Sequence, residues 1–203
     1  ELADKDFAVQ SGLYKIIGEK IDDAYIKCVL GEQLELGDIS DEAKNVSIVY
    51  SPFHGAGYKI VPQVLEAIGA NVTIQPDQAV PDGDFPTLKS PNPEEREGLS
   101  MSIELAEKIG SDLVIATDPD ADRCAVAVIM PDGTVELLSG NQIGVLLCDF
   151  IAQNLRSNGR MPDNAAVIST IVSTLMIKKV CADNNIKYFE VLTGFKYIGE
   201  MIA

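Results

Sequence analysis

The 203-residue sequence lacks any apolar run approaching the roughly 20 residues that a membrane-spanning helix requires, and its first residues do not resemble a signal peptide. We therefore expect no membrane partner. Basic residues are also few, because 16 Lys and Arg stand against 31 Asp and Glu, giving a formal net charge of −15. Such a surface repels a phosphate backbone, so we expect no nucleic-acid partner.

Cysteine is sparse, and no two cysteines form a C-x-x-C pair. We expect buried, reduced thiols and a cytoplasmic setting for all four: Cys28, Cys124, Cys148 and Cys181. An apolar content of 46% is ample for packed cores, which indicates a globular chain. The chain begins without Met, and we expect it to be a segment cut from a longer protein.

Strand and helix patterns alternate along most of the chain. The predicted strands are 46–50, 71–75, 112–116, 124–129, 134–138, 166–171 and 187–191; the predicted helices are 58–68, 100–109, 142–156, 173–184 and a last one after 196. Apolar residues between Tyr14 and Cys28 predict a further helix near the N-terminus. The alternation predicts an α/β fold with mixed, mostly parallel sheets and flanking helices.

Three predicted loops follow strands directly: 51–57, 117–123 and 192–196. Ligands gather beyond the carboxyl ends of parallel strands, so these loops are candidate parts of a site. A longer loop, 76–98, has little predicted secondary structure, and loops of that length tend to be functional.

The predicted loop 117–123 reads Thr117-Asp-Pro-Asp-Ala-Asp-Arg123 and carries a carboxylate at every second position from Asp118. Crowded carboxylates repel one another unless a cation compensates them, and Mg²⁺ prefers oxygen ligands of this kind. Arg123 adds a fork of donors suited to phosphate oxygens. A calcium EF-hand loop is excluded because it needs Gly at Arg123 and an acidic residue at Ile129. On the pattern alone, an acidic surface turn remains the alternative.

Five motifs in register carry a resemblance to a family, the α-D-phosphohexomutases, or phosphoglucomutase/phosphomannomutase superfamily. They are Ser51-Pro-Phe-His-Gly-Ala-Gly57, Ser90-Pro-Asn-Pro-Glu94, Thr117-Asp-Pro-Asp-Ala-Asp-Arg123, Leu138-Ser-Gly-Asn141 and Thr193-Gly-Phe-Lys196. The similarity runs from about residue 46 to the C-terminus. It implies residues 1–40 as a connecting helix from a preceding domain, 41–139 as the second family domain with the metal loop, and 140–203 as the N-terminal part of the third.

The resemblance implies a Mg²⁺-dependent phosphosugar mutase that interconverts hexose 1-phosphate and 6-phosphate through a phosphoserine and a bisphosphate intermediate. It implies Asp118, Asp120 and Asp122 as Mg²⁺ ligands, with Arg123 and Lys196 as catalytic residues. Thr193 and Gly194, together with Lys196, would bind the sugar phosphate. The implied partners are glucose or mannose phosphates and the missing domains of the same parent chain.

Two family features are missing from this sequence. The phosphoacceptor loop needs His directly after Ser, but the sole histidine, His54, follows Phe53. The sugar-specificity loop, Gly-Glu-x-Ser-Gly in relatives, has no counterpart, because Ile202 stands where Ser belongs after Gly199-Glu200-Met201. We therefore expect the fragment to be inactive, with Mg²⁺ affinity in the millimolar range at best.

Two other readings stay open: a phosphopentomutase fragment, and a non-catalytic metal- or phosphate-binding domain. A haloacid-dehalogenase-type phosphatase is disfavoured because its site needs Thr or Ser at the position of Asp122. Among single residues, His54 is expected to be structural. Gly55 and Gly57 are expected to permit a tight strand-to-helix turn, and Ser139 to begin the next helix.

Overall fold

The computed structural model describes residues 3–15, 17–34 and 45–202. The chain divides into two compact units, 1–33 and 34–203. In the first unit, α1 (Lys5–Gln10) and α2 (Glu19–Gly31) contain no buried residue. The predicted N-terminal periodicity is thus only partly helical, because Tyr14 lies between the two helices.

The second unit contains a five-stranded sheet with the strand order β2-β1-β3-β4-β5. Its strands are β1 (Ser47–Ser51), β2 (Asn71–Ile74), β3 (Leu113–Thr117), β4 (Cys124–Ile129) and β5 (Val135–Leu138). β1 pairs in parallel with both β2 and β3, whereas β3-β4 and β4-β5 are antiparallel. The predicted α/β class with a mixed sheet is confirmed.

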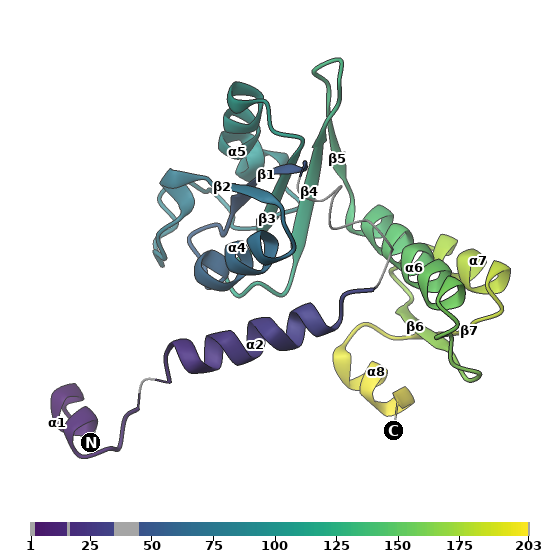
Figure 1. Cartoon of the computed structure of the whole chain (residues 1–203), viewed down its shortest axis with the longest axis horizontal. Helices are drawn as coiled ribbons and strands as arrows, with labels where there is room; N and C mark the ends of the chain where they lie inside the picture. The colour runs from purple at the N-terminus through teal and green to yellow at the C-terminus, as the bar shows by residue number, and fades with distance from the viewer. Residues whose placement is uncertain (1–2, 16, 35–44, 203) are drawn as a thin grey trace. The chain divides into compact units, whose positions relative to one another are not determined.

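Two helices cover this sheet, one on each face (Figure 1). α4 (Gly57–Ala67) joins β1 to β2, and α5 (Arg96–Ile109) joins β2 to β3. The two crossovers run in opposite directions along the sheet, and the right-handed rule for parallel strands then places their helices on opposite faces. Beneath α5 lies the main core: Val49, Phe53, Leu99, Ile103, Ala106, Val114, Ala116, Ala125 and Ala127.

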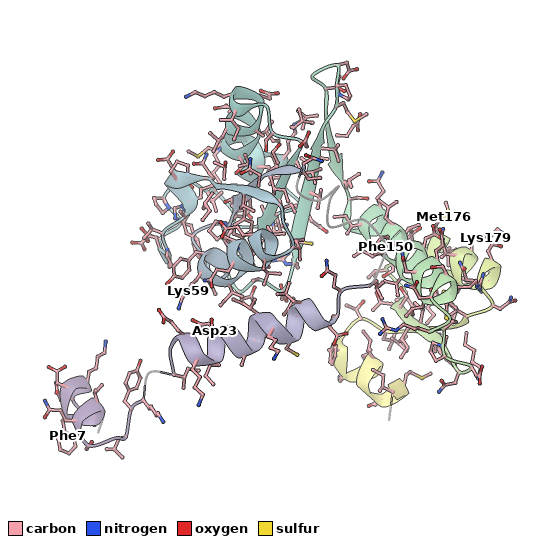
Figure 2. All side chains as sticks on the ribbon, in the orientation of Figure 1. Phe7, Asp23, Lys59, Phe150, Met176 and Lys179 are labelled. Carbon is pink, nitrogen blue, oxygen red and sulfur yellow. The ribbon has the colours of Figure 1, made fainter. Side chains whose placement is uncertain are left out.

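Residues from 140 onward form a smaller sheet of two parallel strands, β6 (Ala166–Thr170) and β7 (Lys187–Val191). Its helices are α6 (Gly140–Ser157), α7 (Met176–Asp183) and α8 (Phe195–Ile202). Ser139 begins α6 as predicted, through a capping box in which its hydroxyl accepts from the Gln142 N–H. Apolar side chains on α6 and α7 remain exposed, including Phe150 at 44% and Met176 at 56% (Figure 2).

Two sequence expectations about packing and loop structure need correction. The four cysteines are free, but Cys28 and Cys124 are exposed rather than buried. Cys28 lies on a helix with no buried residues, and Cys124 directly follows the exposed residues 120–123. The long loop after β2 is also shorter than predicted, because it contains the 3₁₀ helix η1 (Pro76–Gln78) and α5 begins four residues early, at Arg96.

Among the described helices, none is long and apolar enough to cross a membrane. Residues Ser40-Asp-Glu42, whose side chains are of the kind that caps a short helical turn, lie outside the described part of the chain. The expected domain boundaries stay a prediction.

Candidate metal and phosphate site

Residues 117–123, which we call the aspartate loop, form a tight connection between two antiparallel strands. Thr117 ends β3 and pairs with Cys124, which begins β4. Inside the loop, the Asp118 N–H donates to the Arg123 carbonyl (3.3 Å) and the Ala121 N–H donates to the Asp118 carbonyl (3.0 Å). Ala121 has a φ of 59°, in the left-handed region, which turns the chain back on itself. The alternate aspartates are therefore gathered on one compact loop.

The three carboxylates converge. One oxygen from each of Asp118, Asp120 and Asp122 lies within 4.8 Å of the others. Asp118 is 1% exposed, whereas Asp120 and Asp122 face solvent. This donor set fits a hard divalent cation, which takes a few carboxylates and keeps other positions for water or phosphate.

Arg123 compensates the buried charge of Asp118. Its main-chain N–H donates to Oδ1 of Asp118 (3.0 Å) and its Nε donates to Oδ2 (2.8 Å). Both oxygens of the carboxylate are thus engaged, which a buried charge requires. The Arg123 side chain is itself 54% exposed, and its Nε also lies 3.5 Å from Asp122.

The pKa values of the two carboxyls are shifted in opposite directions. Burial raises the pKa of Asp118, but hydrogen bonds from the Arg123 N–H and guanidinium outweigh this and hold it below its usual range. The pKa of Asp122 is raised by its hydrogen bond to Asp118 and by repulsion from Asp120. The two carboxyls resist carrying full charge together, and a bound cation would remove that conflict.

The glycine-rich loop after β1, residues 51–57, packs against the aspartate loop. The Ala56 N–H donates to the Pro119 carbonyl (2.7 Å). A Cβ on Gly55 would lie 2.2 Å from the Pro119 Cα, and a Cβ on Gly57 would lie 2.3 Å from the Tyr50 hydroxyl. Gly55 is required for close approach to the Pro119 main chain, whereas Gly57 leaves room for the side-chain hydroxyl of Tyr50. The turn residues with positive φ are instead Phe53 (48°) and His54 (59°), which corrects the expected role of the glycines.

His54 is structural, as predicted. Its ring is buried, with Nδ1 3.0 Å from the Val80 carbonyl and Nε2 2.9 Å from the Thr87 hydroxyl. A carbonyl accepts and never donates, so Nδ1 carries the proton and Nε2 accepts from Thr87. Thr87 accepts in turn from Gln78, whose Oε1 accepts from Ser51. This network fixes the long loop to the end of β1.

The long loop also reaches the aspartate loop through Asn92. The Nη1 of Arg123 donates to Oδ1 of Asn92 (3.4 Å). The Ser90-Pro-Asn-Pro-Glu94 motif drew attention to this segment, but no sequence pattern singled out Asn92. The fully buried Gln78 was missed for the same reason, since an isolated polar residue in a loop carries no signal of burial.

The predicted substrate-binding residues belong to the smaller sheet. Thr193 and Gly194 follow β7, and α8 begins at Phe195, so Lys196 lies in a helix rather than in the predicted loop. Thr193 and Lys196 are exposed, and the Nζ of Lys196 lies 4.7 Å from the ring centroid of Tyr197. Gly194 has a φ of 135°, a conformation that favours glycine. These residues follow a strand of the smaller sheet, whereas the aspartate loop follows a strand of the larger one.

The fold and the loop define an α/β domain of the phosphosugar-mutase type, and family comparisons agree. The model of phosphoglucomutase/phosphomannomutase α/β/α domain II matches residues 23–129. The model of domain III matches residues 139–203. The chain belongs to the phosphoglucomutase/phosphomannomutase family, within the α-D-phosphohexomutase superfamily.

Curated relatives of this chain are phosphosugar mutases, in agreement with the family models. A Schizosaccharomyces pombe protein described as "Probable phosphoribomutase" is 36% identical over 201 residues, which is 98% of this chain and 32% of the relative. A phosphoglucomutase from Staphylococcus aureus N315 is 38% identical over 160 residues, which is 78% of this chain and 28% of the relative. The chain therefore spans about a third of the length of these relatives.

Solved structures share the fold at low identity. A phosphoglucomutase/phosphomannomutase family protein from Burkholderia thailandensis matches with a TM-score of 0.68 at 18% identity, over 90% of this chain and 35% of that one. Aspergillus fumigatus N-acetylphosphoglucosamine mutase, solved with GlcNAc-6P and magnesium, matches with a TM-score of 0.55 at 15% identity, over 83% of this chain and 36% of that one. At these identities the likeness shows the fold alone.

Proposed function

We propose that this chain provides the metal-binding part of a phosphosugar mutase, an intramolecular phosphotransferase that moves a phosphoryl group between two positions of one sugar. The observation that carries the proposal is the convergence of three carboxylates, within 4.8 Å, at the carboxyl end of a parallel strand. Asp118, Asp120 and Asp122 would hold Mg²⁺. The bound cation would supply charge neutralisation at the phosphoryl group being transferred.

Arg123 is proposed to donate hydrogen bonds to a phosphate beside this site. Its guanidinium presents a planar fork that matches phosphate oxygens, and its exposed side chain can reach a ligand in solvent. Lys196, with Thr193 and Gly194, is proposed to bind the phosphosugar from the smaller sheet. Lys196 would hold the sugar phosphate by charge and assist proton transfer at the hydroxyl that receives the phosphoryl group.

The relatives that support this function are a phosphoglucomutase and a phosphoribomutase, so two substrate classes stand. Hexose phosphates, of glucose or mannose, are the leading proposal. Pentose phosphates are the second candidate, because the S. pombe relative matches 98% of this chain. Titrating the chain with glucose 1-phosphate and with ribose 1-phosphate, while following the amides of residues 193–196 by NMR, distinguishes the two classes.

We expect no mutase turnover from the 203-residue chain by itself, because its sequence contains no Ser-His pair to serve as the phosphoacceptor loop. The serine phosphate would also supply a metal ligand, so we expect Mg²⁺ binding at millimolar concentrations. An affinity in the micromolar range would contradict this expectation.

The metal site is tested by an NMR titration with Mn²⁺, following the backbone amides of residues 117–123. Broadening confined to that loop and reversed by Mg²⁺ is the expected result. Asp120→Ala should weaken binding about tenfold or more, since the exposed Asp120 is proposed as a ligand. Asp132→Ala is the matched control, because Asp132 is an exposed aspartate in the turn before β5. Broadening that is spread over many acidic residues, or unchanged in Asp120→Ala, would refute the site.

A further inference from the structure

Asn92 is held in place independently of Arg123. Its Oδ1 accepts from the Glu94 N–H (3.1 Å), and its main-chain carbonyl accepts from the Glu95 N–H (3.1 Å) just before α5 begins. Prolines flank it on both sides, and Pro93 is fully buried. Proline fixes its own φ and restricts the main chain of the residue before it, so the main chain at Asn92 is constrained while the hydrogen bond from the Glu94 N–H holds the side chain.

The Arg123 guanidinium donates hydrogen bonds to two side chains. Asp118 accepts from its Nε at 2.8 Å, and Asn92 accepts from its Nη1 at 3.4 Å. A guanidinium carries five N–H donors, and among the described residues the other three have no hydrogen-bond partner. The two contacts orient the plane and leave its remaining edge open to an anion.

We propose that Asn92 is a positioning residue that keeps the Arg123 guanidinium aimed at the phosphate when Asp118 is shared with a cation. The proposal rests on the proposed function, in which Arg123 meets phosphate. Both Asp118 oxygens already accept from Arg123, so a cation there competes with the Nε donor. The contact with Asn92 does not depend on Asp118.

The amide is chemically suited to this position. It accepts a hydrogen bond without carrying charge, so it neither attracts the cation nor repels an incoming phosphate. A carboxylate here would add a fourth anion beside three aspartates. Asn92→Ala and Asn92→Asp should therefore have opposite effects on Arg123, although both alter the same loop.

The first test uses the metal-free protein and measures rotation of the Arg123 guanidinium about its Nε–Cζ bond by NMR. Loss of one hydrogen bond in Asn92→Ala should speed this rotation about fivefold. Asn92→Asp keeps an acceptor for the Glu94 N–H and adds charge, so rotation should slow. Equal rotation rates in all three proteins, or shifts in the same direction in both variants, would overturn the proposal.

The second test measures binding of inorganic phosphate in the presence of Mg²⁺. Asn92→Ala should weaken phosphate binding about fivefold while leaving Mn²⁺ broadening of residues 117–123 unchanged. Asp82→Ala is the control, because Asp82 makes the same kind of turn in the same long loop, accepting from the Asp84 N–H (2.9 Å). Equal loss of phosphate binding in the control would indicate a general loop effect and overturn the proposal.

Failure of this inference is distinguishable from failure of the proposed function. If the unmodified chain binds neither Mn²⁺ nor phosphate, the proposed function fails, and with it the role of Asn92 toward phosphate. The rotation measurement would still decide whether Asn92 positions Arg123. If Asn92→Ala does not fold, Asn92→Asp retains the turn and carries the comparison by itself.

Discussion

Two loops in this molecule stand at the carboxyl ends of parallel strands but differ in how far their side chains are buried. Thr117 is the last residue of β3 and Thr193 lies two residues after β7, so each stands at the carboxyl end of a parallel strand. Thr117 is 7% exposed and its hydroxyl lies 2.8 Å from the Tyr50 hydroxyl, whereas Thr193 is exposed. The end of a strand fixes where the main chain of a residue lies. Whether the side chain is buried and hydrogen-bonded depends on the neighbouring segments that pack against it.

The aspartate loop shows what such packing achieves. The glycine-rich loop lies against Pro119, and Asn92 holds Arg123 from the other side. Residues 192–196 have fewer constraints in this structure, and Phe195 is 80% exposed. From this contrast we expect substitutions around β1 and β3 to lower the free energy of unfolding more than equivalent substitutions around α8.

The largest expected effect comes from Gly55→Ala. The added Cβ would meet the Pro119 main chain at 2.2 Å, and neither main chain can yield cheaply. We expect a loss of about 3 kcal/mol in the free energy of unfolding, measured by urea denaturation. Gly199→Ala on α8 is the control, because a Cβ there meets nothing within 4 Å; it should stabilise by up to about 1 kcal/mol. Similar losses in both variants would remove the contrast.

His54→Ala should cost about 2 kcal/mol, because it leaves the Val80 carbonyl and the Thr87 hydroxyl without their ring partners. The comparison is Lys179→Ala, which breaks an exposed ion pair with Asp183 on α7 and should cost at most about 0.5 kcal/mol. Thermal or urea unfolding measures both. If His54→Ala were as mild as Lys179→Ala, the long loop would not depend on the network.

The smallest effect concerns pH. Asp112 accepts from the Ser47 N–H (2.8 Å) and hydroxyl (2.7 Å), and these bonds hold the pKa of its carboxyl below the usual range. A lowered folded-state pKa contributes stability that is present above the unfolded-state pKa and lost as pH falls through the folded-state value. Because Asp112 is exposed, Asp112→Asn should cost only about 0.5 kcal/mol at pH 7.

That difference should shrink as pH falls below the ordinary aspartate pKa and through the lowered folded-state pKa of Asp112, where the carboxyl becomes protonated in both states. Unfolding curves at several pH values measure it. Asp77→Asn is a comparison variant without a Ser47 partner. A cost that persisted unchanged at low pH would show that Asp112 acts by packing rather than by charge.

Much of the fold was predictable because it follows from local pattern. Each strand of the larger sheet occurs within one residue of its predicted bounds, since apolar runs closely followed by Pro, Asp or Ser carry a strong signal. The helix starts were less predictable. α5 begins at Arg96 rather than 100, because the Asn92 carbonyl binds the Glu95 N–H and directs the chain into the helix.

The sequence by itself determined which groups are available at the candidate site: three alternate aspartates and an arginine after a strand, in an α/β chain. Tertiary structure decided which of these groups are held and by what. Burial of Asp118, the closeness of Gly55 to Pro119 and the contact of Asn92 with Arg123 all join segments far apart in the chain. Sequence patterns record periodicity within one segment, whereas such contacts depend on which side chains two folded segments bring within reach.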